Sequence, residues 1–68
     1  MASEPQGIKW LRVYFALQTP SGLEELVDFW RTPPRVGDHL DLSQSFRGKV
    51  TRVVWTSSAE VSVYCEPP

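Results

Sequence analysis

The chain has little cysteine, little histidine and no long hydrophobic run, and each shortage excludes a class of protein. Its single cysteine, Cys65, cannot form an internal disulfide, and its single histidine, His39, has no second histidine or cysteine nearby to complete a metal site. No apolar stretch approaches the roughly 18 residues that a membrane-spanning helix needs. We therefore expect no metal, no cofactor and no membrane partner.

The charges are few and almost balanced. Seven basic and eight acidic residues give a net charge of -1, which offers phosphate groups and anionic lipids no long-range attraction. Residues 1–7 lack the basic start and the apolar middle of a signal peptide, so a cytoplasmic protein is expected. The same residues are polar and contain Pro5 and Gly7, which predicts a frayed tail.

The chain of 68 residues has the length of one small domain, spanning 1–68. Its 41% of hydrophobic and 12% of aromatic residues exceed what a disordered chain contains, so a folded core is expected. A core of this size leaves little room for catalytic machinery, and we expect no enzyme activity. Because neither a disulfide nor a metal stabilises so small a domain, the sequence favours a homo-oligomer.

Four segments carry the alternating or valine-rich patterns of β-strands, namely residues 10–18, 39–42, 46–55 and 61–65. The buried set is expected to include Leu11, Val13, Phe15, Leu17, Val61 and Val63, with Cys65 in phase as a small apolar residue. The alternation slips between Val50 and Val53, which predicts a β-bulge around Thr51 and Arg52. Turns are expected at Pro20 to Gly22 and at Val36 to Asp38.

Residues 23–30 admit two interpretations. A helix over 22–31 would place four apolar residues on one stripe, namely Leu23, Leu26, Val27 and Trp30. A strand would bury Val27 and Phe29 together and turn Leu26 away. We prefer the strand, because the segment is short and follows the first strand through a hairpin-length turn. The helix remains as the alternative and would give an α+β fold.

The aromatic residues out of phase with the expected core are the candidate contact surface. They are Trp10, Tyr14, Trp30, Trp55 and Tyr64. The charged residues also separate, since residues 24–28 are acidic and residues 47–52 are basic. If these two segments were neighbouring strands or faced each other, ion pairs between them would explain why one segment is acidic and the other is basic. A basic patch beside Trp55 and Tyr14 could instead stack a base and touch phosphate.

Parts of the chain resemble known small β-barrels. Residues 36–42, 46–50 and 61–64 are similar to the strand, loop and strand layout of SH3-like barrels, over about half of the chain. Residues 46–50, Phe-Arg-Gly-Lys-Val, also resemble the KOW motif of some ribosomal and transcription proteins. The pattern of prolines, Gly37-Asp38 and a valine-rich strand resembles uncharacterised small bacterial or phage proteins. These resemblances imply a fold without implying an activity.

The sequence as a whole predicts an all-β fold, either a five-stranded SH3-like small barrel or a strongly bent antiparallel sheet. The expected function is a non-enzymatic binding module for a protein partner or for itself. Nucleic-acid binding is the alternative. A third hypothesis is an oligomeric enzyme in which His39 and acidic residues of different chains share a site.

Overall fold

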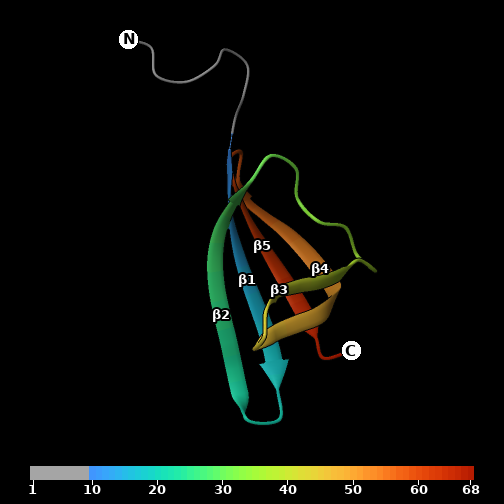
Figure 1. Cartoon of the computed structure of the whole chain (residues 1–68). Coiled ribbons are helices and arrows are strands. Elements are labelled where there is room, and N and C mark those ends of the chain that lie inside the picture. The colour runs from blue at the N-terminus through green and yellow to red at the C-terminus, as the bar shows by residue number, and fades with distance from the viewer. Residues whose placement is uncertain (1–9) are drawn as a thin grey trace.

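The computed structural model describes residues 10–68, which form one sheet of five strands (Figure 1). The strands are β1 (Leu11–Thr19), β2 (Gly22–Trp30), β3 (His39–Ser43), β4 (Phe46–Ser57) and β5 (Glu60–Glu66). The all-β prediction is confirmed, and the alternative helix over 22–31 is a strand. The described residues contain no helix with the length and hydrophobicity that a membrane crossing requires. The tail predicted for residues 1–7 lies outside the described part of the chain.

The strands lie in the order β2-β1-β5-β4-β3. Three of the four pairings are antiparallel, but β1 and β5 run parallel, so the sheet is mixed rather than wholly antiparallel as expected. A parallel pair needs a long connection between its strands. Here the intervening chain supplies it, because it crosses after β2 to the opposite edge and returns through β3 and β4.

A bulge in β4 helps to curl the sheet into a half-barrel (Figure 1). Val50 pairs with Cys65 and Arg52 pairs with Tyr64, which leaves Thr51 as the extra residue and confirms the predicted bulge. The Thr51 hydroxyl donates a hydrogen bond to the Tyr64 carbonyl at 3.2 Å. The bulge keeps both Val50 and Val53 on the concave side, where Val50 is buried and Val53 packs against the core.

The core fills the concave side of the sheet. All six residues expected to be buried are buried, and so is Cys65, where burial raises the pKa of the thiol above its ordinary value. Phe15 lies at the centre. Its ring centroid is 5.4 Å from that of Trp30 and 6.1 Å from that of Phe46, in tilted and edge-on arrangements.

The side chains of β2 face opposite to the prediction. Leu26 and Trp30 pack against the core, whereas Val27 and Phe29 are exposed on the outer face. The register explains the difference, because the short Pro20–Ser21 turn places Leu26 beside the buried Phe15. The expected burial of Val27 and Phe29 was therefore wrong. The strand itself was predicted correctly, and only its orientation was reversed.

Two lysine substitutions on β2 test this orientation. Leu26→Lys should lower the free energy of unfolding by about 2 kcal/mol, since it puts a charged group against the core. Phe29→Lys should change it by less than about 0.5 kcal/mol, because that side chain already points to solvent. Urea denaturation followed by tryptophan fluorescence measures both values. A larger loss for Phe29→Lys than for Leu26→Lys would contradict the observed face.

Candidate binding groove and sheet surfaces

A groove of about 590 Å³ lies between β4 and the loop that joins β2 to β3. It is lined by Thr32, Pro33, Pro34, Arg35, Val36, Val53 and Trp55. Trp55 pairs with the buried Val61, so its side chain lies on the concave side of the sheet. The groove therefore combines one aromatic ring, aliphatic and proline surface, and a single positive charge from Arg35.

The loop wall of the groove is anchored to β4 by backbone hydrogen bonds. The Gly37 N–H donates to the Val50 carbonyl at 2.8 Å, and the Val50 N–H donates to the Asp38 carbonyl at 2.8 Å. The Asp38 carboxylate accepts the Arg35 N–H at 2.9 Å. Gly37 has φ of 98°, which glycine adopts without strain, and it confirms the predicted turn. With two prolines ahead of this turn, the wall is formed before any ligand arrives.

The five aromatic residues predicted as a contact surface do not gather in one place. Trp55 lines the groove, while Tyr14 and Tyr64 lie on the outer face of the sheet. Trp10 stands beside Arg31, whose guanidinium carbon is 5.2 Å from the ring centroid. Trp30 packs on Phe15, so its side chain belongs largely to the core. Trp10 and Trp55 are the most exposed of the five, at 52% each.

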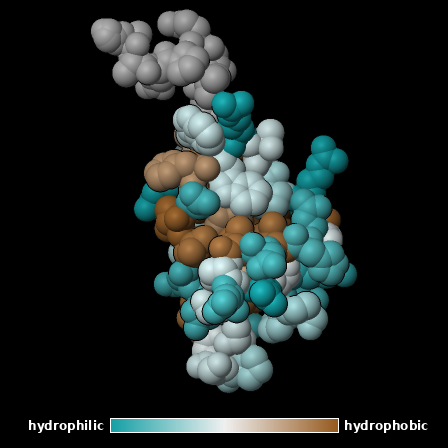
Figure 2. All heavy atoms as spheres, in the orientation of Figure 1, coloured by the Kyte–Doolittle hydropathy of each residue, from teal (hydrophilic) through white to brown (hydrophobic). Residues whose placement is uncertain are grey.

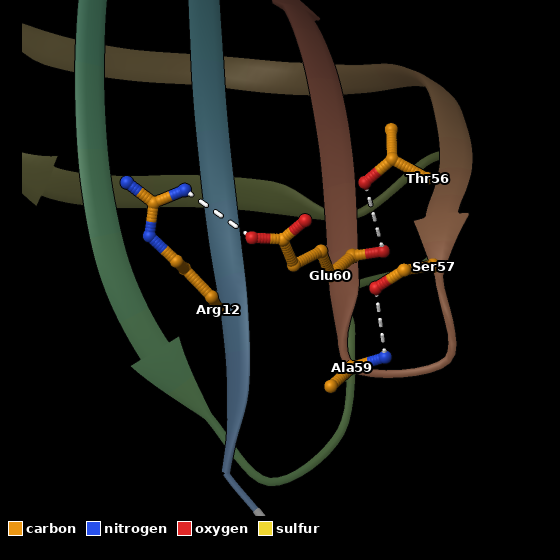
Figure 3. A network of polar contacts seen from close by, with 5 residues as sticks. All are labelled: Arg12, Thr56, Ser57, Ala59 and Glu60. Atoms are coloured by element: carbon orange, nitrogen blue, oxygen red, sulfur yellow. Dashed lines mark hydrogen bonds and ion pairs between the residues drawn. The ribbon is translucent and has the colours of Figure 1, made fainter.

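Polar contacts occupy much of the outer face around β1 and β5. The Arg12 guanidinium lies 3.6 Å from the Glu60 carboxylate across the parallel pair (Figure 3). The Tyr14 hydroxyl donates a hydrogen bond to Glu25, which raises the pKa of Tyr14 above its ordinary value. These pairs are exposed, and each contributes little to stability.

The turn between β4 and β5 is closed by short side chains. The Thr56 hydroxyl donates to the Glu60 carbonyl at 3.3 Å, and the Ser57 hydroxyl accepts the Ala59 N–H at 3.2 Å (Figure 3). The Ala59 carbonyl in turn accepts the Arg12 N–H at 2.9 Å. The turn therefore also holds the start of β1 beside β5.

The acidic and basic segments lie in separate parts of the sheet. β1 and β5 separate acidic β2 from basic β4, so the ion pairs expected between neighbouring strands do not form. Arg47 instead pairs with Asp41 of β3 at 3.2 Å, and Arg52 stacks over Tyr64 at 5.8 Å. The patch expected from Trp55, Tyr14 and basic residues is also not assembled, because these two aromatic rings are on opposite faces.

Within residues 10–68, the carboxylates next to His39 in the sequence are engaged elsewhere. His39 and Asp41 are exposed, Asp41 pairs with Arg47, and Asp38 closes the loop onto Arg35. Within residues 10–68, no group of three or more histidine, cysteine or acidic side chains could hold a metal ion.

Comparison with known proteins provides no family for this chain. No family model matches it, and neither a curated protein nor a solved structure shows significant similarity. The SH3-like resemblance therefore stays a prediction, and the groove has to be interpreted from its own chemistry.

No local pattern in the sequence indicated that residues 32–36 form one wall of the groove. Pro33 and Pro34 were interpreted as the end of a strand, which is where the structure places them. The available signal was an exposed tryptophan in a valine-rich strand together with a rigid proline segment. Their proximity depends on the path of the chain between the two edges of the sheet.

Proposed function

We propose that this domain is a non-enzymatic protein-binding module whose groove holds a short extended peptide. The preferred peptide carries a large apolar side chain next to a carboxylate. The observation that supports this proposal is the exposed ring of Trp55 facing a preformed proline wall, with Arg35 at the same groove. An apolar side chain would cover the ring, and the carboxylate would pair with the guanidinium.

The physical chemistry of the groove favours a protein ligand. Tryptophan and arginine are the residues that most often dominate the binding energy of protein interfaces. The Pro33–Pro34 segment adds apolar surface that loses little conformational entropy on binding. We also propose self-association of the domain, in which a second copy supplies the extended segment that the groove binds.

Nucleic-acid binding has less support. The net charge is -1, and Arg47 and Arg52 already interact with Asp41 and Tyr64. A nucleic-acid ligand in the Trp55 groove would meet one arginine, which is a small fraction of the phosphate contacts that usually provide affinity. A peptide with one carboxylate matches this single charge better.

Selection from a random phage-displayed peptide library tests the proposal. Peptides selected on the wild-type domain should pair an aromatic or aliphatic residue with Asp or Glu. Synthetic versions should bind about tenfold or more weakly to Trp55→Ala, because that change removes the largest apolar surface of the groove. Arg35→Glu should weaken the same peptides and should relax the preference for a carboxylate.

Trp10→Ala is the matched control, because Trp10 is as exposed as Trp55 and does not line the groove. Its peptide affinity should equal that of the wild-type domain. Circular dichroism verifies that all variants are folded. Selected peptides that bind Trp55→Ala and wild type equally, or a selection that yields no binding peptide, would refute the proposal.

A further inference from the structure

The free edge of β2 is a second surface with binding chemistry. β2 is nine residues long and ends the sheet, and within residues 10–68 it pairs only with β1 (Figure 1). An exposed strand of this length presents unpaired backbone N–H and C=O groups to any extended segment. The opposite edge strand, β3, has only five residues.

The register identifies which backbone groups are free. In an antiparallel pair, residues alternate between pairs that exchange hydrogen bonds and pairs that do not. The Arg12 N–H donates to the Ala59 carbonyl on the β5 side, so the pair of Arg12 with Phe29 is of the second kind. By alternation, the backbone groups pointing away from β1 belong to Leu23, Glu25, Val27 and Phe29. The Phe29 N–H already donates to the Asp28 carboxylate at 2.8 Å, so the free N–H groups of this edge are those of Leu23, Glu25 and Val27.

Apolar side chains follow this free edge on the outer face. Leu23 is 53% exposed, Val27 is 45% exposed and Phe29 is 57% exposed. Figure 2 shows hydrophobic atoms in a band across the middle of the visible face, reaching the side where β2 lies. A strand added here would cover apolar surface in addition to pairing the backbone.

The charge of β2 determines which segment fits. The strand contains Glu24, Glu25 and Asp28 and no basic residue. A second copy paired through the same edge would bring six carboxylates, three from each chain, into one interface, where like charges repel. A segment with lysine or arginine would instead form cross-strand pairs of opposite charge.

We propose that β2 accepts, as an antiparallel sixth strand, an extended protein segment that contains both apolar and basic residues. Apolar side chains of that segment lie beside Leu23, Val27 and Phe29, and basic side chains lie beside the three carboxylates. This site is separate from the Trp55 groove, which β4 and the loop 31–38 form on the concave side. The proposal does not depend on the groove being occupied.

A designed seven-residue peptide is the probe. It has valine opposite Leu23, Val27 and Phe29, lysine opposite Glu24, Glu25 and Asp28, and threonine opposite Leu26. In an NMR titration of the 15N-labelled domain, the amide signals of residues 23–29 should shift. The same peptide with glutamate for lysine should bind about tenfold or more weakly, because it places like charges together.

Backbone methylation tests whether the peptide pairs as a strand. N-methylation of the peptide residues whose N–H groups point toward β2 should abolish binding, because it removes those donors. N-methylation of the alternate residues, whose N–H groups point away, should preserve binding. Equal binding of both methylated peptides would exclude strand addition.

Substitutions in β2 complete the test. Val27→Pro removes an N–H at the free edge while leaving the hydrogen bonds to β1, so it should abolish peptide binding in a folded domain. Val27→Thr keeps the N–H and the β-branched shape, and should bind like wild type. Glu24→Lys should narrow the preference for the lysine peptide over the glutamate peptide, because one of the three opposite-charge pairs becomes a like-charge pair while Glu25 and Asp28 remain.

Three further results would overturn the proposal: equal binding of the lysine and glutamate peptides, equal binding by Val27→Pro and Val27→Thr, or no binding at about 1 mM peptide. Trp55→Ala should bind the lysine peptide normally. The proposal for the groove and the proposal for the β2 edge can therefore be refuted independently of each other.

Discussion

Phe15→Ala should lower the free energy of unfolding by roughly 3 to 5 kcal/mol, the cost of removing a buried aromatic side chain. Phe15 has no exposed surface and contacts the rings of Trp30 and Phe46 across the concave side. Small domains have a total stability of about the same size. The variant should therefore be largely unfolded at 25 °C, as measured by urea denaturation and near-UV circular dichroism.

Phe29→Ala is the matched control for this prediction. It removes the same ring from a position that is 57% exposed, and the free energy of unfolding should change by less than about 1 kcal/mol. Similar losses for the two alanine variants would show that Phe15 is not the centre of the core.

Gly48→Val should be the second most damaging substitution, with a loss of roughly 3 kcal/mol or a failure to fold. A Cβ atom at Gly48 would lie 2.7 Å from the Glu66 carbonyl oxygen and 2.8 Å from Leu17 Cδ1. The carbonyl belongs to the backbone of β5, so the clash can be relieved only by moving β4 away from that strand. Position 48 requires glycine because the strands approach each other closely there. Backbone conformation is not the reason, since the φ of Gly48 is not in the left-handed region.

Thermal denaturation measures this effect, with two further variants. Gly48→Ala introduces the same Cβ atom without the rest of the valine side chain, so its melting temperature should already fall by several degrees. Lys49→Val places valine at the next position, where the side chain is exposed, and should melt near the wild-type temperature. A Gly48→Ala variant as stable as wild type would contradict the close approach of β4 and β5.

Local patterns in the sequence were sufficient to predict the individual strands and much of the core. The alternation from Leu11 to Leu17 matches β1, and Val61 to Cys65 matches β5. The slip in alternation located the Thr51 bulge. These features depend on the two-residue period of a strand and on turn chemistry, and both are encoded within a few neighbouring residues.

The candidate binding surfaces were predictable only in part. Trp55 was expected in a contact surface, and the structure exposes it in the groove, but binding itself stays a prediction. The orientation of β2 was missed because Val27 and Phe29 are as apolar as Leu26. A local pattern with apolar residues on both faces does not specify which face meets the core.

The sequence alone therefore determined an all-β chain, the positions of its turns, the bulge in β4 and most of the buried residues. The tertiary structure decided the parallel pairing of β1 with β5, the face of β2 that meets the core, and the meeting of the loop 31–38 with Trp55. It also decided that, within residues 10–68, acidic β2 lies at one edge of the sheet, away from basic β4. The physical reason is that strand order and pairing arise from contacts between distant segments, which compete for partners across the whole chain and leave no short-range periodic signal.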